Sequence, residues 1–106
     1  MNLQKKYFDF VKSGTKRIEL RLLDEKRKVI KVGDRIDFEC DGASVATRVI
    51  GLLYYQNFKE IAKDFPMEML AEEGFLEEEL MKSLEEFYTP GLQSKYGVVG
   101  FRFELM

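Results

Sequence analysis

The segment Gly14–Arg21, GTKRIELR, lies where the sequence changes from a helical pattern to a strand pattern, and it decides the fold. Its five ionisable or hydroxyl side chains surround only two apolar ones. Lys12 and Gly14 are typical of a helix end, because a basic side chain complements the helix dipole and glycine tolerates the conformation that follows. From residue 18 the apolar side chains alternate, which places Glu19 and Arg21 together on the other face of a strand.

The remainder of the chain has strand patterns on both sides of an acidic helical block. Expected helices cover 4–13, 57–65 and 77–88, with a short acidic turn or helix over 66–74. Expected strands cover 16–23, 36–40, 45–55 and 97–105, with an additional short strand at 1–3. Gly51 indicates a bend or bulge that lets the sheet curl. The sequence therefore predicts one α+β domain over residues 1–106. Its curled, mainly antiparallel sheet has about five or six strands, an N-terminal helix and a helical insertion before the last strand.

The composition excludes several kinds of site. The chain has no histidine and one cysteine, so catalytic pairs with histidine, structural zinc sites and an internal disulfide are excluded. No metal site or cofactor is expected. The N-terminus lacks the apolar region of a signal peptide, and no apolar run is long enough to cross a bilayer. We therefore expect a cytoplasmic protein without a membrane partner.

Charge is distributed unevenly along the chain. Residues 1–35 hold eleven Lys and Arg against five Asp and Glu, and residues 56–91 hold three against ten. This asymmetry predicts a face suited to anions and a separate acidic face. The alternative is two ordinary solvated surfaces.

The polar residues of GTKRIELR suit a ligand that has an anionic part. Arg21 offers a planar fork for phosphate, carboxylate or a base edge, and Glu19 can orient it or accept a hydrogen bond. Lys16 adds a movable positive charge, and Thr15 a hydroxyl group. The alternative is a solvated strand face with a Glu–Arg pair of little energetic value.

The same segment resembles the G-x-K-x-x-E-x-R signature of the ASCH domain family, a branch of the PUA-like barrels. The segments KVGD and KYGVVGF are also similar to the small stand-alone members. The resemblance implies a β-barrel with a cleft beside the first helix, with Lys16, Glu19 and Arg21 at or near it. It also implies RNA or a nucleotide-like small molecule as the partner.

Three functions stay open on this basis. The first is a binding module in which Lys12 and Arg17 attract phosphate, and Tyr96 or another tyrosine (Tyr54, Tyr55, Tyr88) stacks on a base. The second is a small hydrolase of modified nucleosides, similar to ASCH-like amidohydrolases, although those have threonine as the nucleophile where this chain has Glu19. The third is a protein-interaction adaptor that uses the acidic helices. The ligand and the oligomeric state do not follow from the sequence.

Overall fold

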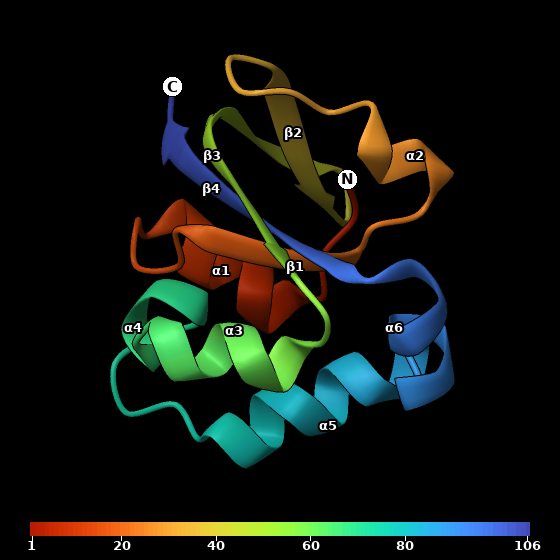
Figure 1. The fold of residues 1–106 in the computed structure, drawn as a ribbon. Helices are drawn as coiled ribbons and strands as arrows, with labels where there is room; N and C mark the ends of the chain where they lie inside the picture. The colour runs from red at the N-terminus through yellow and green to blue at the C-terminus, as the bar shows by residue number, and fades with distance from the viewer.

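The computed structural model describes residues 1–106 and shows an α+β fold (Figure 1). A four-stranded antiparallel sheet has the strand order β1-β4-β3-β2. The strands are β1 (Ile18–Leu22), β2 (Arg35–Cys40), β3 (Ala43–Tyr55) and β4 (Val98–Leu105). The helices are α1 (Lys5–Lys12), α2 (Glu25–Lys28), α3 (Phe58–Asp64), α4 (Met67–Leu70), α5 (Glu77–Phe87) and α6 (Pro90–Tyr96).

The long strand β3 gives the sheet its curl. It pairs with β2 through its first half and with β4 along most of its length. Between Val49 and Gly51 the register to β4 shifts by one residue, so Ile50 is the extra residue of a bulge. A bulge increases the local twist of a strand, and here the sheet closes into a half-barrel. The bend predicted at Gly51 is therefore confirmed.

The sheet separates two hydrophobic cores. The core inside the curl is made by Phe8, Val11, Ile36, Phe38, Val49, Val99, Phe101 and Phe103. The core between sheet and helices is made by Tyr7, Ile18, Leu20, Leu22, Phe58, Ile61, Leu70, Ala71, Leu80, Met81 and Val98. Helices α3 to α6 lie together on one side of the half-barrel in Figure 1, as the predicted helical insertion requires. Because α1 contributes to both cores, it lies against the sheet at the junction between them.

Three details of the sequence prediction were wrong. The sheet has four strands, because residues 1–3 contribute only one isolated bridge, between Asn2 and Glu39. Residues 25–28, which lie outside the expected helices, form the short helix α2, in which the Asp24 side chain accepts from the backbone N–H of Arg27. Finally, residues 90–96, which also lie outside the expected helices, form α6, because the Thr89 side chain accepts from the backbone N–H of Leu92.

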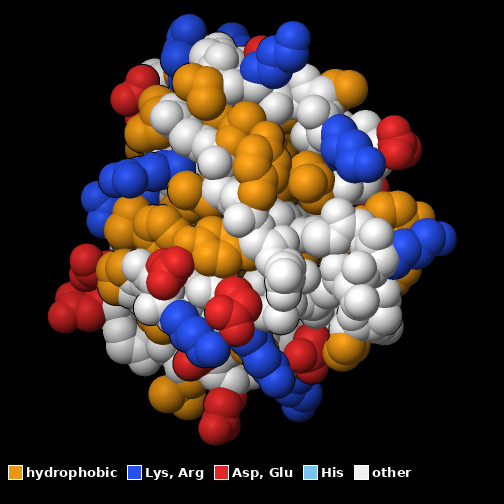
Figure 2. Space-filling view, in the orientation of Figure 1, with side chains coloured by type: hydrophobic (Ala, Val, Ile, Leu, Met, Phe, Trp, Pro, Cys, Tyr) orange, Lys and Arg blue, Asp and Glu red, His pale blue; other side chains and the backbone are white.

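Figure 2 shows the face of the molecule that β3 crosses. Hydrophobic side chains gather over the strands in the middle of this face, and Ile50 and Tyr54 of β3 are both exposed. Acidic and basic side chains are mixed over the helices below. None of the helices is long and apolar enough to span a bilayer.

Candidate ligand-binding cleft

A cleft of about 370 Å³ lies between β1, the N-terminal segment and helix α5. Its apolar walls come from Leu3 on one side and from Leu80, Leu84 and Phe87 on the other. The polar side chains that line it include Lys16, Glu19 and Arg21 of the signature segment. Strand β1 is the edge strand of the sheet and pairs only with β4, so its other edge is open to this side.

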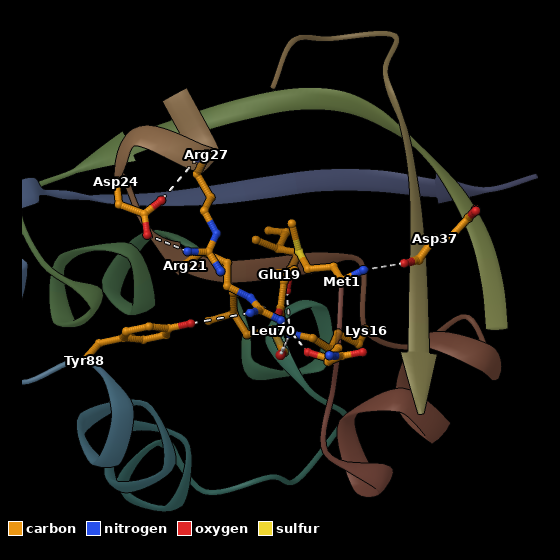
Figure 3. A network of polar contacts seen from close by, with 11 residues as sticks. Met1, Lys16, Glu19, Arg21, Asp24, Arg27, Asp37, Leu70 and Tyr88 are labelled. Atoms are coloured by element: carbon orange, nitrogen blue, oxygen red, sulfur yellow. Dashed lines mark hydrogen bonds and ion pairs between the residues drawn. The ribbon is translucent and has the colours of Figure 1, made fainter. Parts of the chain in front are cut away.

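Lys16 is the innermost charged group, and its position follows from the turn before β1. Gly14 takes a positive φ of 85°, and the backbone N–H groups of Thr15 and Lys16 both donate to the Phe10 carbonyl at the end of α1. This turn directs the Lys16 side chain inward, and only 2% of the residue is exposed. Figure 3 shows the resulting polar network.

Each N–H of the Lys16 ammonium group has an acceptor. Its Nζ lies 2.6 Å from the Ile18 carbonyl oxygen, 2.8 Å from that of Leu70 and 3.2 Å from Glu19 Oε1. Burial lowers the pKa of Lys16, while the carboxylate of Glu19 opposes that shift. Three acceptors match the three donors of a charged ammonium group, so Lys16 is a fixed cation and not the movable charge that the sequence suggested.

Glu19 and Arg21 share one face of β1, as the alternation predicts. Arg21 Nε donates to Glu19 Oε2 over 2.8 Å, and Arg21 Nη2 donates to the Asn2 carbonyl over 2.7 Å. Burial alone would raise the pKa of Glu19, but Lys16 and Arg21 hold it below its usual value. Glu19 is therefore an ionised carboxylate between two cations, with only 9% of its side chain exposed.

Two contacts hold α1 against α5 beside the cleft. The Tyr7 hydroxyl lies 3.1 Å from Ser83 Oγ, and Lys6 Nζ lies 2.8 Å from Glu79 Oε1. The second contact is an exposed ion pair, so screening by solvent leaves it little energetic value. The first is partly buried, and both of its hydroxyl-bearing residues line the cleft.

Aromatic side chains lie at the end of α5. Phe87 is 61% exposed and lines the cleft. The Tyr88 ring stacks obliquely on Phe58, with centroids 5.8 Å apart, while its hydroxyl lies 3.5 Å from Arg21 Nη1. The cleft therefore combines a charged floor with flat apolar surface at its rim.

The structure brings three of the seven predicted site residues together, namely Lys16, Glu19 and Arg21. The remaining four, Thr15, Lys12, Arg17 and Tyr96, do not line the cleft. Thr15 bonds to Ser13, Lys12 and Arg17 are exposed, and Tyr96 packs on the helix-side core. Of the other tyrosines considered for stacking, only Tyr88 lines the cleft.

The sequence reasoning missed the wall that α5 provides. Leu80, Ser83, Leu84 and Phe87 recur at intervals of three, one and three residues, which places them on one helix face. That spacing is the signal by which they could have been found. The contribution of Asn2 and Gln4 has no comparable signal in the sequence.

Comparison with known proteins agrees with this architecture. The family model for the ASCH domain matches residues 1–106. The crystal structure of the hypothetical protein PH0355 superposes with a TM-score of 0.88 at 38% identity, covering 100% of this chain and 96% of that one. The solution NMR structure of protein PF0455 from Pyrococcus furiosus superposes with a TM-score of 0.79 at 34% identity, covering 100% and 94%.

No curated protein matches the sequence. The family match spans the whole chain, and the two solved structures share its fold over 96% and 94% of their length. Helix α1 lies against the sheet, as the resemblance implied, but the sheet is a four-stranded half-barrel and not the β-barrel that the resemblance implied. The chain is therefore a member of the ASCH domain family.

Proposed function

We propose that this protein binds a nucleobase in the cleft, carried either by single-stranded RNA or by a nucleotide-like small molecule. The observation that carries the proposal is the combination of apolar walls with a charged floor. Leu84 and Phe87 offer surface for the face of a ring, and Glu19 and Arg21 offer an acceptor and a donor for its edge. Unpaired bases are recognised through these two kinds of contact.

The charged floor keeps hydrogen-bonding capacity for a ligand. A guanidinium group has five N–H donors, and Arg21 directs one each to Glu19, to the Asn2 carbonyl and to Tyr88. The Glu19 carboxylate accepts one contact on each oxygen, from Lys16 and Arg21, while a carboxylate has about four lone-pair sites. Both groups can therefore add a bond to a ligand without breaking those that hold them in place.

The size and the flanking charge of the cleft also support this function. Its volume of about 370 Å³ is near the lower end of small-molecule sites and suits a single nucleoside. Helix α2 begins three residues after β1 ends and carries Lys26, Arg27 and Lys28. Arg27 is paired with Asp24, which leaves the exposed Lys26 and Lys28 to attract the phosphate groups of a nucleotide or RNA strand.

The hydrolase alternative has less support from the geometry. The Thr15 hydroxyl bonds to Ser13 Oγ over 3.1 Å and does not line the cleft. Lys16 has its three N–H groups engaged by acceptors within the protein, so its nitrogen is not free to act on a ligand. The adaptor alternative has no specific observation in its favour.

The test compares two exposed apolar residues, one that lines the cleft and one that does not. Phe87→Ala removes a side chain from the rim of the cleft, whereas Leu76→Ala removes one that is 66% exposed and does not line the cleft. Nucleoside monophosphates and short single-stranded RNAs are titrated separately, which distinguishes the two sources of the base. We expect Phe87→Ala to weaken binding by about tenfold, within the range for stacking on one base, and Leu76→Ala to bind as the wild type does. Equal behaviour of both variants, or no binding to any ligand, would refute the proposal.

A further inference from the structure

We propose that main-chain groups on the open edge of β1 form hydrogen bonds to the base and thereby select it. In this arrangement, the N–H and C=O groups of Leu20 bond to an adjacent acceptor and donor on the Watson–Crick edge of an unpaired nucleobase. The inference rests on the proposed function and names the contact that selects the ligand.

The direction of these groups follows from the register between β1 and β4. The Arg17 carbonyl accepts from Phe103, and the Leu23 N–H donates to Gly97. Because bonding residues alternate along an antiparallel strand, the odd-numbered residues of β1 direct their main-chain groups to β4. Leu20, which lies opposite Gly100, therefore directs its N–H and C=O to the open edge.

That open edge faces the cleft. The Ile18 carbonyl points the same way as the groups of Leu20, and it accepts from the ammonium group of Lys16, which lines the cleft. Leu20 also lines the cleft, although only 2% of the residue is exposed. Buried main-chain polar groups need a hydrogen-bond partner. Because water reaches the Leu20 groups poorly at this depth, a ligand that bonds to them gains affinity.

The edge is too short to accept another strand. A peptide that adds to a sheet needs a row of free main-chain groups. Here the Ile18 carbonyl is occupied by Lys16. Of the two residues further along β1 that direct main-chain groups to this edge, Leu20 and Leu22, only Leu20 lines the cleft. The N–H and C=O groups of Leu20 at this edge therefore fit a small planar ligand better than a strand.

An unpaired base has the complementary chemistry. Within one extended residue, N–H and C=O point the same way, so Leu20 offers a donor beside an acceptor. Uracil offers N3–H beside a carbonyl oxygen, and adenine offers the N6 amino group beside N1. In a duplex these atoms are occupied by the paired base, so the contact selects single-stranded or free bases.

The test uses ligands that differ by one methyl group. Uridine monophosphate is compared with its 3-methyl form, which loses the N3–H donor, and with its 5-methyl form, which keeps the edge intact. Guanosine monophosphate, whose N1–H lies beside a carbonyl oxygen, is compared in a parallel series with its 1-methyl form, which loses this donor and stays neutral. Binding is followed by the amide ¹H and ¹⁵N shifts of the whole chain, so the signal of Leu20 is observed directly.

We expect the Leu20 amide to shift with at least one of the two unmodified nucleotides. Methylation at N3 or N1 should weaken binding by at least about tenfold, because it leaves buried polar groups unpaired, while the 5-methyl form should bind like uridine monophosphate. If cleft residues such as Phe87 shift, but the Leu20 amide does not and edge methylation has no effect, the main-chain contact is refuted and the proposed function stands. If no nucleotide shifts any residue of the cleft, both are refuted.

Discussion

The ammonium nitrogen of Lys16 lies 2.8 Å from the carbonyl oxygen of Leu70, and this bond ties the segment before β1 to the last residue of α4. The three charged residues of the signature segment therefore have two different roles. Lys16 is fixed between main-chain carbonyls and Glu19 and holds the helical insertion to the half-barrel. Glu19 and Arg21 are held in turn by Lys16 and by each other, and they keep the remaining bonding capacity at the floor of the cleft.

Lys16→Met is expected to destabilise the protein strongly. The variant keeps an apolar stem of similar length and loses the ammonium group, so it leaves two buried carbonyls without a donor and Glu19 without one of its cations. Breaking a buried ion pair on one side costs about 3–5 kcal/mol, a large part of the stability of a domain of this size. Urea denaturation measures the loss. Lys12→Met, at an exposed position, is the control and should change stability by less than about 0.5 kcal/mol. A similar small change for Lys16→Met would show that the ion pair does not hold the fold.

The sequence predicts the long strands and the main helices well, because each has several turns or alternations of pattern. Strands β3 and β4 and helix α5 are examples of this kind. Helix α2 has four residues, too few for an apolar period to be visible. Its only signal is the capping residue Asp24, which is also common in turns.

The candidate site was predictable in part. Alternation alone placed Glu19 and Arg21 on one face, and the family resemblance added the cleft. The burial of Lys16 was not predictable, because one of its acceptors, Leu70, lies 54 residues further along the chain. The spacing of the cleft-lining residues of α5 predicts that they share one helix face. Nothing in the sequence indicates which part of the fold that face covers.

The stability should fall at acid pH partly through Glu19. Burial would raise the pKa of this carboxyl, but the cations beside it hold the pKa below its usual value of 4.5. A group whose pKa is lowered by folding stabilises the native state above the unfolded value, and this contribution is lost as pH falls through the folded value. The free energy of unfolding of wild type should therefore exceed that of Glu19→Gln at pH 7, and the gap should narrow as the pH falls below about 4.5. Urea denaturation of both proteins across this pH range measures the difference in free energy of unfolding. A difference that is constant with pH would mean that folding does not lower the pKa of Glu19.

Salt dependence should reveal whether α2 contacts phosphate. Lys26 and Lys28 are exposed on a helix that follows directly from the β1 end at which Arg21 lies. For a short single-stranded RNA, each phosphate contact that is removed should lower the slope of log K against log salt concentration by about 0.7. The double variant Lys26→Gln with Lys28→Gln should therefore bind more weakly at low salt and show a flatter slope.

The matched control for that experiment removes the same charge elsewhere. Lys59 and Lys82 are exposed on α3 and α5, in the acidic part of the chain. Changing both to Gln alters the net charge as the α2 variant does, so long-range attraction falls similarly, but no phosphate contact near β1 is lost. If only the α2 variant flattens the slope, the RNA backbone runs along α2 beside the cleft. If both variants flatten the slope by the same amount, α2 acts through net charge alone. If the slope stays as in the wild type in both variants, the phosphates lie on another part of the surface.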